Sequence, residues 1–341
     1  MPTAHQKMWH RASGPSSMAE VNEDPREVPW HPRYAKTLVG QGGTATQFRK
    51  AFASGKPHHA WLVHGPKGIG KATFAYHMAA ETLGGDGPQT RRWIESRAHP
   101  DLFVLERQLN DAKPRKLKAE ISVEDARSLS SFLARTASGN WRVAIIDAAD
   151  DLNAESANAI LKLVEEPPPK VLMFLISQQP GKLLRTLRSR CIRLALERLS
   201  ETDCAHIINN LPLDLKPQNE EQFQAVAKSG GNPGRALALL GSVGAKTFGT
   251  FSQLSKPKSS QLLAIANQFS GRSVGPEEFS IFTEMLQDWV ATVAKTKASP
   301  HLAAAHVAIC ENTRITQGFN LDHKTAVLSQ LTLVNDALKA S

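Results

Sequence analysis

Apolar residues between positions 60 and 177 form short runs that alternate with segments of helical spacing. The runs cover residues 60–64, 101–105, 142–147 and 171–177. Runs of this length, with few polar interruptions, are typical of strands that are buried on both faces of a parallel sheet. We therefore expect an α/β domain in which helices cover both faces of a parallel sheet.

Start and stop signals delimit the helices between these strands. The helix after the first strand is expected to end near Gly84. Ser122, with Asp125 three residues later, predicts a capping box for a helix that reaches about residue 135. Asn153 is the expected N-cap of a further helix, which Pro167 stops.

The strand pattern ends near residue 196, and only helical patterns follow. The chain contains no internal repeat. We expect a disordered tail over residues 1–25, an α/β domain over 26–196, a small helical domain over 197–244 and a larger helical domain over 245–341.

Residues 65–72 follow the phosphate-binding pattern G-x-x-x-x-G-K-[ST] up to its last position. Gly65, Gly70 and Lys71 occupy fixed places between a strand and a helix, but Ala72 stands where the pattern has Ser or Thr. Backbone N–H groups of such a loop bind phosphates, whereas the missing hydroxyl would have been a ligand of Mg²⁺. Thr73 is a partial substitute one residue further on. The candidate nucleotide-binding residues here are Gly65, Pro66, Gly68, Gly70, Lys71, Ala72 and Thr73.

Asp147 ends the run 142–147, where the Walker-B aspartate of such nucleotide sites is expected. The next residue is Ala148, where related ATPases carry a glutamate that polarises water. Loss of both the hydroxyl at 72 and the acid at 148 predicts a site that does not hydrolyse ATP. Whether ATP or ADP occupies the loop stays open.

Composition narrows the class of protein. The chain has 341 residues, of which 41% are hydrophobic, but no run of eighteen apolar residues and no apolar signal-peptide core. We therefore expect no membrane association and a cytoplasmic location. The three cysteines are widely separated, so we expect neither disulfides nor a bound metal. The net charge of +9 allows an acidic partner such as DNA, and the basic stretch 113–118 is either a solvated loop or a DNA contact.

Three sets of side chains near these motifs are better explained by a structural role than by catalysis or metal binding. His58 and His59 have no nearby carboxylate or cysteine that would complete a metal site, so we expect them to pack. Glu165 and Glu166 precede three prolines at a helix end, where they are expected to help turn the chain. Cys191 has no adjacent base and is expected to pack against the sheet.

Taken together, several motifs resemble those of the AAA+ clamp-loader subunits of bacterial DNA polymerase III, over about residues 29–240. Besides the loop at 65–71, they are Leu38-Val39-Gly40-Gln41, His99-Pro100-Asp101-Leu102, Asn158-Ala159-Ile160-Leu161-Lys162 leading to Glu165-Glu166-Pro167-Pro168, Ser189-Arg190-Cys191 and Gly231-Asn232-Pro233-Gly234-Arg235-Ala236-Leu237. The resemblance implies an AAA+ P-loop domain, a small helical lid and a C-terminal helical collar that holds a five-membered ring together.

The same resemblance assigns roles to single residues. Asp147 would be the Walker-B aspartate, and Ser177 or Gln178 would occupy the sensor-1 position. Arg235 matches the sensor-2 position of the lid. Arg190 resembles the arginine finger that reaches the ATP site of the adjacent gamma/tau subunit.

The function implied is that of a non-hydrolysing clamp-loader subunit and component of the DNA polymerase, without intrinsic ATPase activity. Its partners would be gamma/tau and delta subunits in a hetero-pentamer, with the sliding clamp and primer-template DNA contacted through the complex. Many such subunits carry a four-cysteine zinc module, which is absent from residues 81–100, so no zinc is expected. Two alternatives stay open: an active ATPase of the gamma/tau type in which Thr73 helps to hold magnesium, and a DNA-binding AAA-like protein outside any clamp loader.

Overall fold

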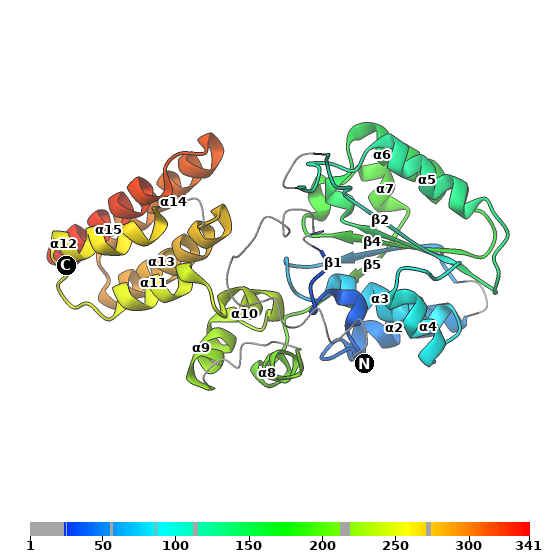
Figure 1. Cartoon of the computed structure of the whole chain (residues 1–341), viewed down its shortest axis with the longest axis horizontal. Helices are drawn as coiled ribbons and strands as arrows, with labels where there is room; N and C mark the ends of the chain where they lie inside the picture. Colours follow the sequence, from blue (N-terminus) through cyan, green and yellow to red (C-terminus); the bar gives the residue numbers. More distant parts are fainter. Residues whose placement is uncertain are drawn as a thin grey trace, which may run out of the picture. The chain divides into compact units, whose positions relative to one another are not determined.

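The computed structural model describes residues 24, 26–54, 57–85, 87–111, 115–211, 219–270 and 274–341. Apart from residue 24, the predicted tail lies outside the described residues, as do Lys113 and Pro114 of the basic stretch. The chain divides into two compact units, Met1–Lys216 with Gly230–Gly234, and Pro217–Ser229 with Arg235–Ser341 (Figure 1). The chain therefore passes between the units three times.

The first unit is built on a five-stranded parallel sheet with the strand order β2-β3-β4-β1-β5. Its strands are β1 (Ala60–His64), β2 (Leu102–Glu106), β3 (Arg142–Asp147), β4 (Val171–Ser177) and β5 (Ile192–Ala195). Three predicted strands have the observed bounds, and the fourth, β2, is displaced by one residue. The sequence pattern did not predict β5. Because β5 is a short edge strand that exposes Arg193 and Ala195, it lacks the continuous apolar run of a doubly buried strand.

Helices cover both faces of this sheet, as Figure 1 shows. One face carries α2 (Gly42–Ala53), α3 (Lys71–Thr82) and α4 (Pro88–Glu95), and the other carries α5 (Val123–Leu133), α6 (Ala154–Glu165) and α7 (Arg185–Ser189). Alternate residues of each strand face the two cores: Trp61 and Val63 point to the first, Leu62 to the second, and all three are fully buried. The predicted α/β fold is confirmed.

The predicted helix starts are observed in atomic detail. Ser122 and Asp125 form a complete capping box at the start of α5. The Asn153 side chain accepts a hydrogen bond from Ser156 N at 2.9 Å and caps α6. Each cap satisfies a backbone donor that would otherwise be unpaired, and so fixes where the helix begins.

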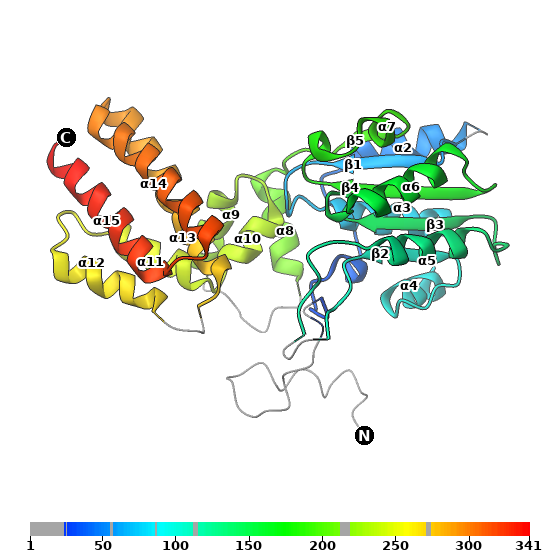
Figure 2. The same ribbon diagram turned by 90° about the horizontal axis from the view of Figure 1, so that it is seen from above.

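The remaining elements are helical. The first unit also contains α8 (Glu201–Asn210), and α10 (Pro233–Leu239) begins in it and continues into the second unit. The second unit contains α9 (Asn219–Ser229), α11 (Val243–Ser252), α12 (Ser259–Ala266), α13 (Pro276–Lys297), α14 (Pro300–Phe319) and α15 (His323–Lys339). Within it, α14 contacts both α13 and α15 (Figure 2). None of the described helices combines the length and apolar character needed to cross a membrane.

Candidate functional site

The predicted phosphate loop joins the carboxyl end of β1 to the start of α3. Gly65, Gly68 and Gly70 have φ angles of 152°, 81° and 97°, a region that residues with a side chain rarely adopt. Ile69 is 1% exposed and anchors the loop in the core beneath it. The glycines of the motif therefore serve the backbone conformation that the motif requires.

Lys71 begins α3 and folds back over the loop. Its Nζ donates hydrogen bonds to the carbonyl oxygens of Gly65 and Pro66, both at 2.8 Å. Burial lowers the pKa of Lys71 to about 8, although the charges of Asp147 and Asp150 oppose this shift. The amine is thus held inside the loop, close to the two aspartates.

Ala72 and Thr73 occupy different faces of α3. Ala72 packs its methyl group against the core between the sheet and helices α2–α4. Thr73 lies about 100° further around the helix axis, because an α-helix has 3.6 residues per turn. Its hydroxyl therefore starts from a different direction than a hydroxyl at position 72 would, and the motif position itself presents a methyl group.

Asp147 lies at the end of β3, directly beside Glu106 at the end of β2. Burial, and next the neighbouring charge of Glu106, raise the pKa of Asp147 to about 6, while Lys71 opposes the shift. Ala148 follows and is 6% exposed. Asp147 therefore lies close enough to Lys71 for each charge to affect the pKa of the other, and no acidic side chain follows at position 148.

Asp150 organises the end of β4, a role that the sequence analysis missed. Its carboxylate accepts hydrogen bonds from Ser177 Oγ at 2.8 Å, from Gln178 N at 2.6 Å and from Gln179 N at 3.2 Å. Of the two predicted sensor-1 candidates, Ser177 is fully buried and bound to Asp150, whereas the Gln178 side chain is exposed. Asp150 fixes both of them relative to β3.

A segment far along the chain packs on the phosphate loop. We call Gly230–Gly234 the clasp segment. Asn232 Nδ2 donates to Lys67 O at 2.6 Å across 165 residues, and Gly234 N donates to Gly68 O at 3.0 Å. A Cβ atom on Gly68 would lie 2.7 Å from Asn232 Oδ1 and 3.0 Å from Gly234 Cα. The backbones of the two segments are therefore in direct contact, which only glycine permits at these positions.

Arg235 immediately follows the clasp segment. Its Nη2 forms an ion pair with Asp288 Oδ2 of α13 at 2.9 Å, within the second unit. Its guanidinium is thus engaged by α13.

Arg190 lies at the amino ends of the strands, whereas the phosphate loop lies at their carboxyl ends. It directly follows α7 and precedes β5, whose first residue, Ile192, pairs with Trp61 near the start of β1. Since the loop leaves the carboxyl end of the same strand, the two sites are separated by the length of β1, about 16 Å for five residues. The structure therefore brings Lys71 and Asp147 together but leaves Arg190 apart from them.

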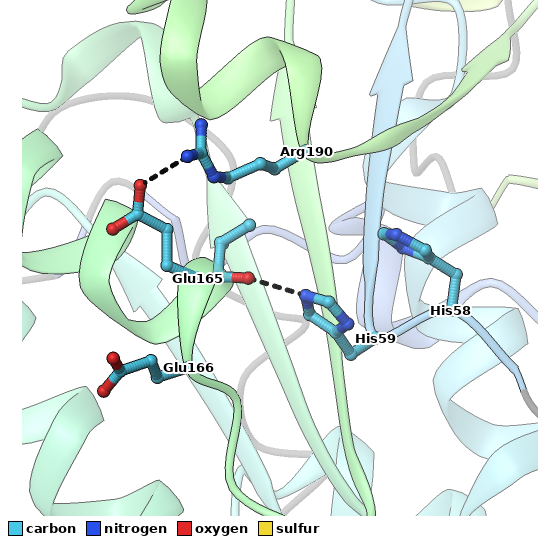
Figure 3. A pocket seen from close by; sticks show the side chains of 6 residues that line it. His58, His59, Glu165, Glu166 and Arg190 are labelled. Atoms are coloured by element: carbon cyan, nitrogen blue, oxygen red, sulfur yellow. Dashed lines mark hydrogen bonds and ion pairs between the residues drawn. The ribbon is translucent and has the colours of Figure 1, made fainter.

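Arg190 borders a cavity of ≈ 490 Å³, shown in Figure 3. Its Nη2 lies 2.9 Å from Glu165 Oε1, and its Nη1 donates to Thr186 O at 3.1 Å. The side chains of Arg190 and Glu165 are 42% and 38% exposed. The residues that line the cavity are His58, His59, Val164, Glu165, Glu166 and Arg190.

The two histidines of this cavity are held by backbone groups. Their rings stack with centroids 4.6 Å apart. His58 Nδ1 lies 2.9 Å from Ala60 O, and His59 Nε2 lies 2.8 Å from Val164 O. In the part of the chain that the structure describes, no three His, Cys, Asp or Glu side chains are grouped so as to hold a metal ion.

Cys191 packs beside the core between the sheet and helices α5–α7. Its Sγ donates to Leu187 O at 3.3 Å, and burial raises the pKa of its thiol to about 12. The thiolate, which is the nucleophilic form, is therefore disfavoured.

Known proteins resemble the first unit most clearly. Residues 40–200 match the family model described as DNA polymerase III, delta subunit. DNA polymerase III subunit delta′ of Pseudomonas aeruginosa is 35% identical over 193 residues, which cover 54% of this chain and 56% of that protein. DNA polymerase III subunit gamma of Buchnera aphidicola is 30% identical over 186 residues, which cover 53% of this chain and 50% of that protein. The chain thus spans about half the length of the curated relatives it matches.

A solved structure of a DNA polymerase III gamma subunit-related protein from Thermotoga maritima is also similar, with a TM-score of 0.49 and 16% sequence identity. The similarity covers 86% of this chain and 99% of that one.

Proposed function

We propose that this chain, which is related to the clamp-loader subunits of DNA polymerase III over residues 40–200, acts in such a clamp loader without hydrolysing ATP itself. Its contribution to ATP turnover would be Arg190, supplied in trans to the nucleotide site of a neighbouring gamma/tau subunit. There the planar guanidinium would contact the terminal phosphate and offset the charge that develops during its transfer.

The position of Arg190 is the observation that carries this proposal. Arg190 precedes β5 at the amino ends of the strands, whereas Lys71 and Asp147 lie at the carboxyl ends. A guanidinium at the amino ends of the strands cannot reach the phosphate loop of its own chain, because the length of the strands lies between them. It is half-exposed and therefore accessible to a second subunit.

Two residues, at positions 72 and 148, are the reason to expect that this chain does not hydrolyse ATP. The first presents a methyl group where Mg²⁺ would be bound, and the second lacks the carboxylate that would orient the attacking water. Relatives named delta′ and gamma both match this chain, so the distinction between a supporting subunit and a motor rests on these two residues. Weak binding of ATP or ADP remains part of the proposal, because the loop backbone and Lys71 are retained.

The partners belong to the proposal as well. They are the gamma/tau and delta subunits of a hetero-pentamer, with the sliding clamp and primer-template DNA reached through the assembled complex. The nucleotide-sensing roles of Gln178 and Arg235 stay predictions from the sequence resemblance.

The test is ATP hydrolysis by the purified chain, alone and assembled with gamma/tau and delta subunits, with Arg190 intact or replaced by alanine. We expect no turnover alone. Arginine fingers contribute on the order of 10³–10⁵ in kcat, so Arg190→Ala should silence the neighbouring site and reduce the rate to the share of the remaining sites.

Arg185→Ala is the matched control, because Arg185 is an exposed arginine on the same short helix, α7. An unchanged rate in Arg190→Ala would remove the trans role. Substantial turnover by the chain alone would instead identify a gamma/tau-type ATPase. Tight, steeply salt-dependent DNA binding without partners would favour a DNA-binding protein outside the clamp loader.

A further inference from the structure

In this chain the guanidinium of Arg190 already has a carboxylate partner. Its Nη2 lies 2.9 Å from Glu165 Oε1, while Nη1 donates to Thr186 O of its own helix. Figure 3 shows the Glu165 carboxylate directed at Arg190 and the adjacent Glu166 carboxylate directed away from it. The group proposed to act on a neighbouring subunit is thus engaged within its own chain.

The carboxylate is presented by a fixed helix end. Glu165 is the last residue of α6, and the backbone N–H of Glu166 donates to Lys162 O at 3.0 Å. The imidazole of His59 holds the same turn through its 2.8 Å contact with Val164 O. The backbone that carries Glu165 is therefore anchored both by its own helix and by His59.

The local electrostatics disfavour a glutamate at this position unless it is paired. A negative charge in the last turn of a helix is repelled by the partial negative charge of the unpaired carbonyl groups there. Arg190 neutralises the charge of Glu165 from the adjacent element. Glu166 makes no ion pair or side-chain hydrogen bond within the described residues, so the pairing is specific to one of two neighbouring acids.

We propose that Glu165 is the resting partner of Arg190: it holds the guanidinium when the neighbouring site is empty and yields it to the terminal phosphate of a nucleoside triphosphate there. This inference rests on the trans role of Arg190 proposed above. It makes Glu165 a positioning residue that sets how readily Arg190 engages the triphosphate.

The energetics suit an exchange of partners. Both side chains are more than one-third exposed, and exposed ion pairs of this kind shift an equilibrium by only about 1.4- to 5-fold. A terminal phosphate offers close to two negative charges and three acceptor oxygens, which suit the planar fork of arginine better than a single carboxylate oxygen. The ion pair is therefore weak enough to be broken by the ligand and strong enough to compete with it.

The experiment measures binding of a slowly hydrolysed ATP analogue, and of ADP, to the complex assembled with gamma/tau and delta subunits. Glu165→Gln should tighten binding of the analogue at the neighbouring site by about 1.4- to 5-fold. It should leave ADP binding unchanged, because ADP lacks the γ-phosphate, which is the group that Arg190 would contact. Glu166→Gln is the matched control and should change neither affinity.

The Arg190→Ala background separates this inference from the proposed function. If Arg190→Ala alone lowers ATP turnover and abolishes the effect of Glu165→Gln, both are supported. If Arg190→Ala lowers turnover but Glu165→Gln behaves like Glu166→Gln or weakens the analogue, only the resting-partner role is overturned. If Arg190→Ala changes nothing, the trans role itself fails. A Glu165→Gln effect that is equal for ADP and the analogue would indicate a merely structural role and would also overturn the inference.

Discussion

Replacing Gly68 by alanine tests the contact between the phosphate loop and the clasp segment. The φ angle of 81° at Gly68 is strained for alanine, at a cost of about 1–2 kcal/mol. The new Cβ would also lie 2.7 Å from Asn232 Oδ1 and 3.0 Å from Gly234 Cα, so the clasp segment must move. Moving the clasp segment adds about 1–3 kcal/mol to the destabilisation, either through overpacking or through the loss of two hydrogen bonds.

Gly70→Ala is the control for backbone strain. Gly70 has a φ angle of 97°, but a Cβ placed there meets no atom within 4 Å. This variant should therefore cost only the strain of about 1–2 kcal/mol. The difference between the two variants isolates the contact with the clasp segment.

Hydrogen exchange followed by mass spectrometry, on peptides that cover residues 230–234, provides the assay. The Gly234 amide donates to Gly68 O at 3.0 Å and should be protected in the unmodified chain. A difference of about 1–3 kcal/mol corresponds to about 5- to 150-fold faster exchange in Gly68→Ala than in Gly70→Ala. Equal exchange in the two variants would refute the contact.

Two further predictions concern pH. The pKa of Lys71 is about 8 in the folded chain against 10.5 for the free group, so the unfolded chain binds more protons between these values. Stability to urea should therefore rise with pH across that window, and Lys71→Met should lack this rise; parallel pH profiles would contradict the shifted lysine. The pKa of Asp147 is about 6 in the folded chain against 3.8, so the folded chain binds more protons between these values and stability should fall as pH rises from about 4 to 6. The stability of Asp147→Asn, measured relative to the unmodified chain, should therefore increase as the pH rises through this range. A difference in stability that stays constant with pH would contradict the prediction.

Local patterns predicted most of the first unit. The capping box at Ser122 and Asp125 and the N-cap at Asn153 depend on residues three positions apart, so the sequence alone displays them. The buried strands are equally visible, because both of their faces are apolar. Edge strand β5 was missed because an exposed face interrupts its apolar pattern.

Contacts between distant segments were beyond such patterns. The sequence places Arg190 after the last predicted strand but does not show that Glu165 lies beside it, and it offered a turn as the explanation of Glu165 and Glu166. The bond between Asn232 and Lys67 likewise depends on how two loops meet in space. Pairings of this kind follow from packing of the whole unit, which no local spacing encodes.

The clasp segment also sets an order of events during synthesis on the ribosome. Lys67 emerges 165 residues before Asn232, a delay of roughly 8–33 s at translation rates of about 5–20 residues per second. The last strand, β5, ends at Ala195, so the sheet can be complete before the clasp segment is translated, but until then the carbonyl groups of Lys67 and Gly68 lack the partners they have in the finished protein. The clasp segment is the last part of the first unit to be translated, and a product that terminates between residues 196 and 229 would carry the whole sheet without a finished loop.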